Sequence, residues 1–186
     1  MTVAISAACV SIIGGIIIFL LNQRSQITLE RRQAQINRIG NQLRLLYGPL
    51  CVLVDVNEAI WEKLRESQLP DQATRRSGTP LTQEEHERWK SWRDIAFMPA
   101  NMRMRDLIIE HADLIIGPSL PSPLRIFCAH VTASEVLISG ESDASRVAQG
   151  ALIGHPGKSY VEYVRQSFAD LKAEQARLLR LSAPRH

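Results

Sequence analysis

The feature that most constrains this chain is a run of nineteen consecutive uncharged residues at positions 3–21. At ~1.5 Å per residue such a run forms a helix of roughly 28 Å, close to the ~30 Å thickness of bilayer hydrocarbon. A cleavable signal has a shorter apolar stretch behind a basic segment, and no Lys or Arg precedes this run. The sequence therefore predicts a transmembrane anchor at residues 1–22, with a buried core helix as the alternative.

Basic residues flank this anchor on one side only. Arg24, Arg31 and Arg32 follow it, and Glu30 is the single acid between residues 22 and 44. Lys and Arg beside a membrane span are enriched on its cytoplasmic side. We therefore expect a single-pass membrane protein with its N-terminus outside and its C-terminal domain cytoplasmic. These three arginines are the candidate membrane-interface residues, and the lipid bilayer is the first expected partner.

Length and charge limit what the rest of the chain does. Of the 186 residues, those outside the anchor are enough for one domain with a proper core. The net charge of +3 is small and is explained by the arginines beside the anchor. No broad basic stripe with interleaved aromatic residues follows, so we expect no nucleic-acid partner.

The soluble part predicts an all-α fold, because its apolar residues recur at helical spacing and polar or Pro/Gly-rich segments separate them. We expect a cytoplasmic bundle of about four helices. Residues 23–66 form the juxtamembrane segment and the first bundle helix, residues 67–81 a polar loop, residues 82–181 the remainder of the bundle, and residues 182–186 a tail.

The first bundle helix carries an apolar seam with alternating spacings of three and four, interrupted once by Asn57. An asparagine in such a seam fixes register in parallel coiled-coil dimers, which favours a homodimeric stalk. Apolar residues off the seam favour an intramolecular bundle instead. Pro49 predicts a kink or break. The seam consists of Ile36, Ile39, Leu43, Leu46, Leu50, Leu53, Asn57, Ile60 and Leu64.

Local signals place the later helices. Thr82 and Glu85 have the spacing of a capping box, so a helix begins there, and Pro99 interrupts it. We expect a short buried helix at residues 124–139, a loop at residues 140–157 and a strongly amphipathic helix at residues 158–181.

No sequence motif announces a catalytic site. The best cluster of reactive side chains is a candidate buried polar site of His111, Cys128 and His130, whose spacing is poor for metal ligands because Cys128 and His130 point to different sides of a helix. We therefore expect no cofactor, no metal and no catalytic residues. A membrane-tethered ligand sensor or enzyme that uses this site is the alternative function.

Trp89 and Trp92 lie three apart in the charged stretch EEHERWKSWRD, which suggests partial exposure. Core packing is the commoner role of such residues, but they are also the candidate partner face. Together with the anchor, this face predicts an accessory, assembly or scaffold subunit that docks onto another membrane protein or complex.

Overall fold

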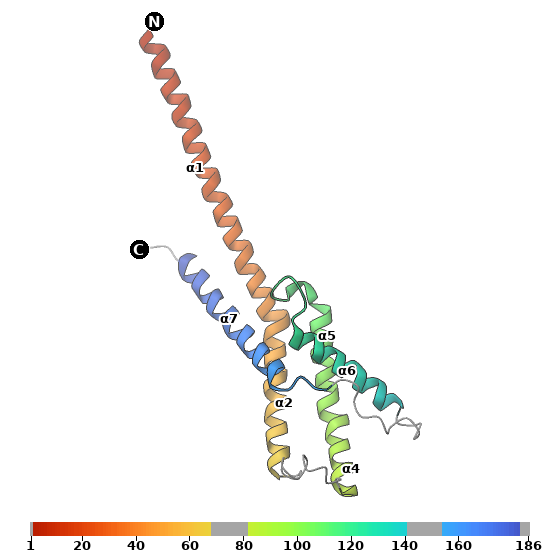
Figure 1. Cartoon of the computed structure of the whole chain (residues 1–186). Helices are drawn as coiled ribbons and strands as arrows, with labels where there is room; N and C mark the ends of the chain where they lie inside the picture. Colours follow the sequence, from red (N-terminus) through yellow and green to blue (C-terminus); the bar gives the residue numbers. More distant parts are fainter. Residues whose placement is uncertain (1, 68–81, 141–153, 183–186) are drawn as a thin grey trace. The chain divides into compact units, whose positions relative to one another are not determined.

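The computed structural model describes the backbone of residues 2–67, 82–140 and 154–182, and the side chains of residues 18–66, 82–139 and 154–180. In these ranges the chain is helical and contains no strand, which confirms the all-α prediction (Figure 1). The elements are α1 (Thr2–Asn41), the π-helical turn η1 (Gln42–Tyr47), α2 (Gly48–Ser67), α4 (Gln83–Trp92), the π-helical turn η2 (Arg93–Phe97), α5 (Met98–Glu110), the 3-10 turn η3 (Ala112–Leu114), α6 (Ser122–Gly140) and α7 (Lys158–Ser182).

Among the described residues, no helix is both long enough and apolar enough to cross a membrane. This finding gives no support to the predicted transmembrane helix. The side chains at positions 3–17, which make up most of the predicted span, lie outside the described residues. Residues 68–81 of the predicted polar loop and residues 141–153 of the second predicted loop also lie outside them.

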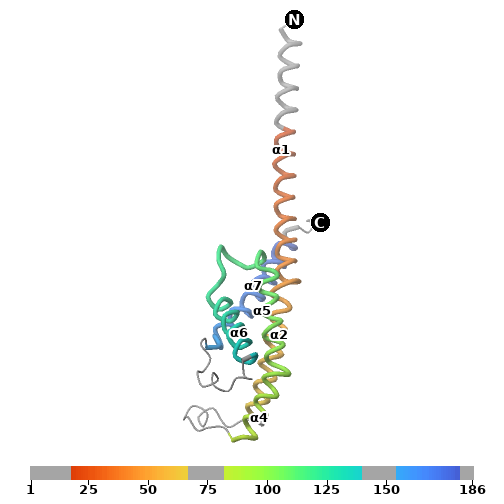
Figure 2. The backbone as a smooth tube through the Cα atoms, turned by 90° about the vertical axis from the view of Figure 1, so that its right-hand side faces the viewer, coloured from red at the N-terminus to blue at the C-terminus, as the bar shows by residue number. Residues whose placement is uncertain are grey.

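Contacts divide the chain into two units. The first comprises residues 1–40 and 174–186, and the second comprises residues 41–173. In the first unit, the last turns of α7 run beside α1 in the opposite direction (Figures 1 and 2). Gln35 Nε2 donates a hydrogen bond to Glu174 Oε1 at 3.2 Å, and Ile39 and Leu178 are both buried.

The second unit is built on an antiparallel pairing of η1 and α2 with the segment from α4 to η3. These two helical segments contact each other in antiparallel order, so residues late in the first segment meet residues early in the second. Trp61 meets Phe97 at 6.2 Å between ring centroids, Asn57 Nδ2 donates to Asn101 Oδ1 at 3.1 Å, and Gln42 Nε2 donates to the Leu114 carbonyl at 2.9 Å. The two segments therefore keep one antiparallel register along their length.

Helix α6 and the first half of α7 complete the bundle. Arg105 on α5 forms an ion pair with Glu135 on α6, and Phe127 on α6 stacks on Tyr160 of α7. Arg165 Nε on α7 meets Asp55 Oδ1 on α2 at 2.8 Å. The side chains that are almost completely buried mark the core: Leu46, Tyr47, Leu50, Met104, Leu124, Phe127, Val131, Tyr160 and Val164.

The predicted seam lies inside this arrangement. Ile39 is buried in the first unit, and Leu46, Leu50 and Leu64 are buried in the second. The Asn57 side chain bonds Asn101 of the same chain rather than facing solvent. These contacts agree with the bundle interpretation of the seam, and Asn57 has an intramolecular partner. The homodimeric stalk stays a prediction.

Both prolines predicted to disturb a helix follow a π-helical turn. The turn η1 ends directly before Gly48-Pro49, and η2 ends directly before Met98-Pro99. The Gly48 amide donates a hydrogen bond to the Leu43 carbonyl, and the Met98 amide donates to the Arg93 carbonyl. Each acceptor lies five residues back in the sequence. A proline ring collides with the carbonyl four residues earlier in an α-helix. We attribute the wider turns to that conflict, because they let the helix continue past the proline.

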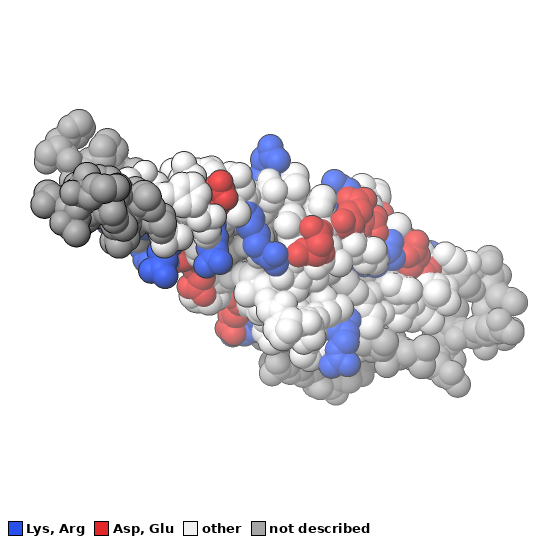
Figure 3. Space-filling view, turned by 90° about the horizontal axis from the view of Figure 1, so that it is seen from above, with Lys and Arg blue, Asp and Glu red and all other residues white. Residues whose placement is uncertain are grey.

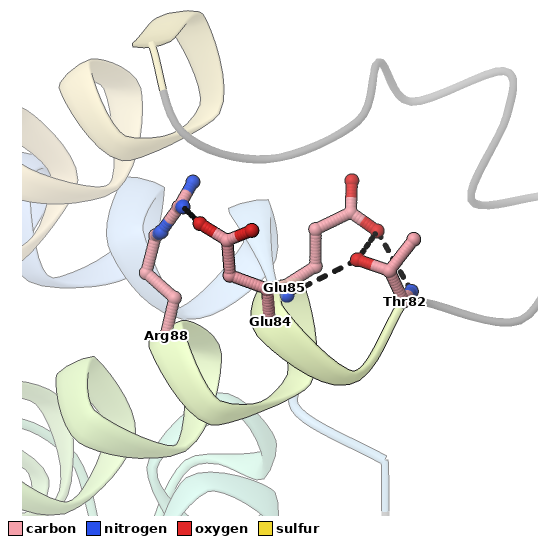
Figure 4. Close-up of polar contacts among 4 residues, drawn as sticks. All are labelled: Thr82, Glu84, Glu85 and Arg88. Atoms are coloured by element: carbon pink, nitrogen blue, oxygen red, sulfur yellow. Dashed lines mark hydrogen bonds and ion pairs between the residues drawn. The ribbon is translucent and has the colours of Figure 1, made fainter.

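The start of α4 matches its sequence signal. Thr82 Oγ1 accepts a hydrogen bond from the Glu85 amide at 3.2 Å, and the Thr82 amide donates to Glu85 Oε2 at 2.8 Å (Figure 4). Arg88 and Glu84 add an ion pair one turn later at 2.7 Å. The capping box is thus confirmed, and α6 and α7 begin and end within two residues of their predicted limits.

Gly48→Ala should destabilise the protein, although the same change usually stabilises a helix interior. A Cβ atom at Gly48 would overlap the Leu43 carbonyl oxygen, a backbone atom that moves only if η1 reorganises. We expect a loss of about 1–3 kcal/mol in denaturant unfolding followed by circular dichroism. Gly40→Ala is the matched control, since nothing lies within 4 Å of its added Cβ, and it should gain about 0.5–1 kcal/mol. Equal effects at both positions would contradict this account of η1.

Asn57→Leu should cost about 1 kcal/mol of stability, because it leaves the Asn101 amide without its partner inside the bundle. The double change Asn57→Leu/Asn101→Leu should recover part of that loss. Light scattering should give the same molar mass for the wild type and both variants. A change of oligomeric state on Asn57→Leu would favour the stalk instead.

Candidate functional site

The three candidate membrane-interface arginines lie on α1. Arg24 and Arg31 are exposed and Arg32 is half-buried. Just before them, four consecutive large apolar residues, Ile18 to Leu21, are 50–64% exposed. Four consecutive helical residues point in all directions around the axis, so this stretch of α1 has no polar side.

The candidate partner residue Trp89 is part of an aromatic cluster. Its ring lies 5.8 Å from Trp61 on α2 and 5.9 Å from Phe97 on η2, measured between centroids. The contact with Trp61 is edge-to-face, and the contact with Phe97 is tilted. Aromatic pairs at such distances stabilise packing beyond the area that they bury. Trp89 therefore packs between two helices, as the packing interpretation predicted, and both Trp89 and Trp92 are half-buried.

The candidate buried polar site is assembled differently from the sequence prediction. His130 lies 5.1 Å from His155, between ring centroids, and His155 also meets Phe127 edge-on at 5.9 Å. Phe127 and Tyr160 are stacked at 4.0 Å, and Tyr160 Oη donates to Met104 Sδ at 3.4 Å. This ring cluster of Phe127, His130, His155 and Tyr160 joins α6 to the start of α7.

The other two members of the predicted site have ordinary structural environments. Burial raises the pKa of the Cys128 thiol, with Arg105 opposing it, so the reactive thiolate is disfavoured. His111 ends α5, where its carbonyl accepts the Leu114 amide at 3.0 Å. In the part of the chain that the structure describes, no three His, Cys, Asp or Glu side chains are grouped as metal ligands would be.

His155 is the second histidine of the ring cluster, and the predicted site did not include it. Its Nδ1 accepts a hydrogen bond from the Gly157 amide at 2.9 Å, and Gly157 has the left-handed φ of 60° that favours glycine. The motif His155-Pro156-Gly157 thereby starts α7. The pKa of His155 is lowered to about 4, because packing among the rings removes water and His130 lies nearby.

A second polar contact ties η1 to the segment after α5. The buried Tyr47 Oη accepts the Ile116 amide at 3.1 Å and lies 3.2 Å from Tyr163 Oη. Burial, followed by this contact with Tyr163, raises the pKa of Tyr47, so the phenol stays protonated. The sequence analysis treated Tyr47 only as part of a break at Gly48-Pro49.

Charged side chains of both signs are interspersed on the face shown in Figure 3. Among the described residues, ion pairs form between helices, as for Arg165 with Asp55, and within a helix, as for Arg177 with Glu174. In the described ranges, these charged side chains therefore form ion pairs that link or stabilise helices.

The chain matches no protein-family model, no curated protein and no solved structure with which it was compared.

We expect protonation of His155 to destabilise the fold. Its folded pKa of about 4 lies below the ordinary value of 6.5, so stability falls as the pH drops from about 6.5 to about 4. His155→Asn keeps an acceptor for the Gly157 amide but does not titrate. Because His155 retains solvent exposure, which screens its charge, we expect the wild type to lose only about 1 kcal/mol relative to this variant over that range.

Urea unfolding across this pH range gives the free energy of unfolding of the wild type and of His155→Asn. The difference between the two values isolates the titration of His155, because the carboxylates titrate in both proteins. His155→Ala, which removes the acceptor as well, should be less stable at every pH. Parallel pH profiles for the wild type and His155→Asn would contradict the packing of His155 in the ring cluster.

Proposed function

We propose that this chain is a membrane-anchored helical docking subunit. Residues 3–21 hold it in a bilayer, its bundle lies on the cytoplasmic face, and the bundle binds another membrane protein or complex. Its activity is positional: confinement to the membrane raises the effective concentration of the bundle near its partner, so a modest intrinsic affinity suffices.

The observation that carries this proposal is the apolar character of α1 on every side at Ile18 to Leu21, where all four side chains are at least half exposed. A helix that is apolar all round needs an apolar environment, either a protein core or lipid. These residues continue the uncharged run that starts at position 3, and Arg24 follows three residues later. That order, apolar and then basic, is typical of a membrane span that ends at the cytoplasmic surface.

The bundle has surface left for a partner. Trp89 and Trp92 are half-buried on α4, and tryptophan is enriched among residues that dominate binding energy. Trp92 is the better residue to test, because Trp89 also packs against Trp61 and Phe97. His155, Tyr160 and Tyr47 each hydrogen-bond a group of this chain outside the ring cluster: the Gly157 amide, Met104 Sδ and the Ile116 amide. These intramolecular bonds favour docking over a ligand site among these residues.

The test is purification of the full chain from its native membranes in mild detergent, followed by mass spectrometry and light scattering. We expect the chain in the carbonate-resistant membrane fraction with a stoichiometric partner. Ile12→Glu/Ile13→Glu should move it out of that fraction, since each charge at the centre of a span costs about 2.5–3.5 kcal/mol. Ile95→Glu, at a bundle position that is 80% exposed, is the matched control and should leave the fraction unchanged.

The partner face is tested in the same preparation. Trp92→Glu should release the partner while circular dichroism reports an intact fold, and Val136→Glu, at a 68% exposed position of α6, should retain it. A wild-type chain found in the soluble fraction would overturn the anchor. A membrane-bound chain that emerges alone would overturn docking.

A further inference from the structure

Two segments that are far apart in the sequence carry one set of basic side chains in the first unit. Among the side chains described there, six arginines stand against two glutamates, a net charge of +4. Four of the arginines lie on α1 and two on the last turns of α7: Arg24, Arg31, Arg32, Arg38, Arg177 and Arg180.

The hydrogen bond between Gln35 and Glu174 aligns α7 with α1 along their axes, and so determines which α1 arginines lie at the height of the α7 arginines. Because α7 runs opposite to α1 in this unit, residues after Glu174 advance toward Arg24 (Figures 1 and 2). At ~1.5 Å per residue, Arg180 lies about 9 Å beyond Glu174 in that direction. The last turns of α7 therefore bring two arginines to the part of α1 that contains Arg31, about 12–15 Å along the helix from the end of the uncharged run at Leu21.

Exposed apolar side chains accompany these charges. Leu179 is 53% exposed beside Arg180, and Leu29 is 66% exposed beside Glu30 and Arg31. The side chain of Arg177 is 59% exposed even in its ion pair with Glu174. Arginines interspersed with exposed leucines are typical of helices that lie in the head-group region of a membrane.

We propose that the last turns of α7 form a second membrane contact, in which Arg177 and Arg180 bind anionic lipid head groups beside Arg24 and Arg31. Charge complementarity selects the lipid class, because an anionic membrane surface attracts basic residues that lie within a Debye length of it. This inference rests on the proposed function, since it takes residues 3–21 as the anchor that brings α7 to the bilayer.

The test uses the full chain in nanodiscs of phosphatidylcholine alone, or of phosphatidylcholine with about one third phosphatidylserine. Hydrogen exchange of the α7 backbone after residue 174 is measured in both. We expect about tenfold slower exchange in the anionic discs. Arg177→Gln/Arg180→Gln should abolish the difference between the two lipids. Arg125→Gln/Lys172→Gln removes two exposed basic residues from the second unit and should preserve it.

The outcomes separate this inference from the anchor. A chain that inserts in both discs and exchanges equally in them overturns the lipid contact and leaves the anchor intact. A chain that inserts in neither overturns the proposed function, and the contact with it. Loss of the difference in the control variant also overturns the contact, because net charge would then explain it. Slow exchange in phosphatidylcholine discs that arises only on adding an acidic polypeptide would assign this surface to a protein partner instead.

Discussion

Two prolines inside long helical segments impose the constraint on which the bundle depends. Pro49 and Pro99 each follow a turn that bonds across five residues, so each helix continues past its proline. The first of these turns places Gln42 and Tyr47 against the segment after α5, and the second places Phe97 against Trp61. The antiparallel register of the core therefore follows from how the chain accommodates residues that ordinarily break a helix.

The reactive side chains of the bundle are used within the fold. Tyr47, Asn57 and His155 each bond a backbone or side-chain group of the same chain, and burial disfavours the thiolate of Cys128. What distinguishes the chain chemically is instead its surface, where apolar residues of α1 and arginines from two segments lie in one unit.

Features set by residues close in sequence could be predicted, and those set by distant residues could not. The capping box of Thr82 and Glu85 depends on groups three residues apart, so its pattern was sufficient. The spacing of apolar residues in α2 showed which face of the helix packs against the bundle. It did not show that Asn101 would bond Asn57. His130 was recognised without His155, because twenty-five residues separate them and nothing in either segment specifies the other. The nearness of the α7 arginines to α1 was missed for the same reason, since it depends on tertiary contacts.

The wide turn at Gln42–Tyr47 has a consequence for chain length. A turn that bonds across five residues contains one residue more than an α-helical turn at the same place. Deleting any one residue from it would leave an ordinary α-helical turn, with the helix beyond it in the same orientation. The ring of Pro49 would then collide with the carbonyl four residues earlier. The number of residues in this segment is therefore specified as well as their identity, because the extra residue lets the helix continue past the proline.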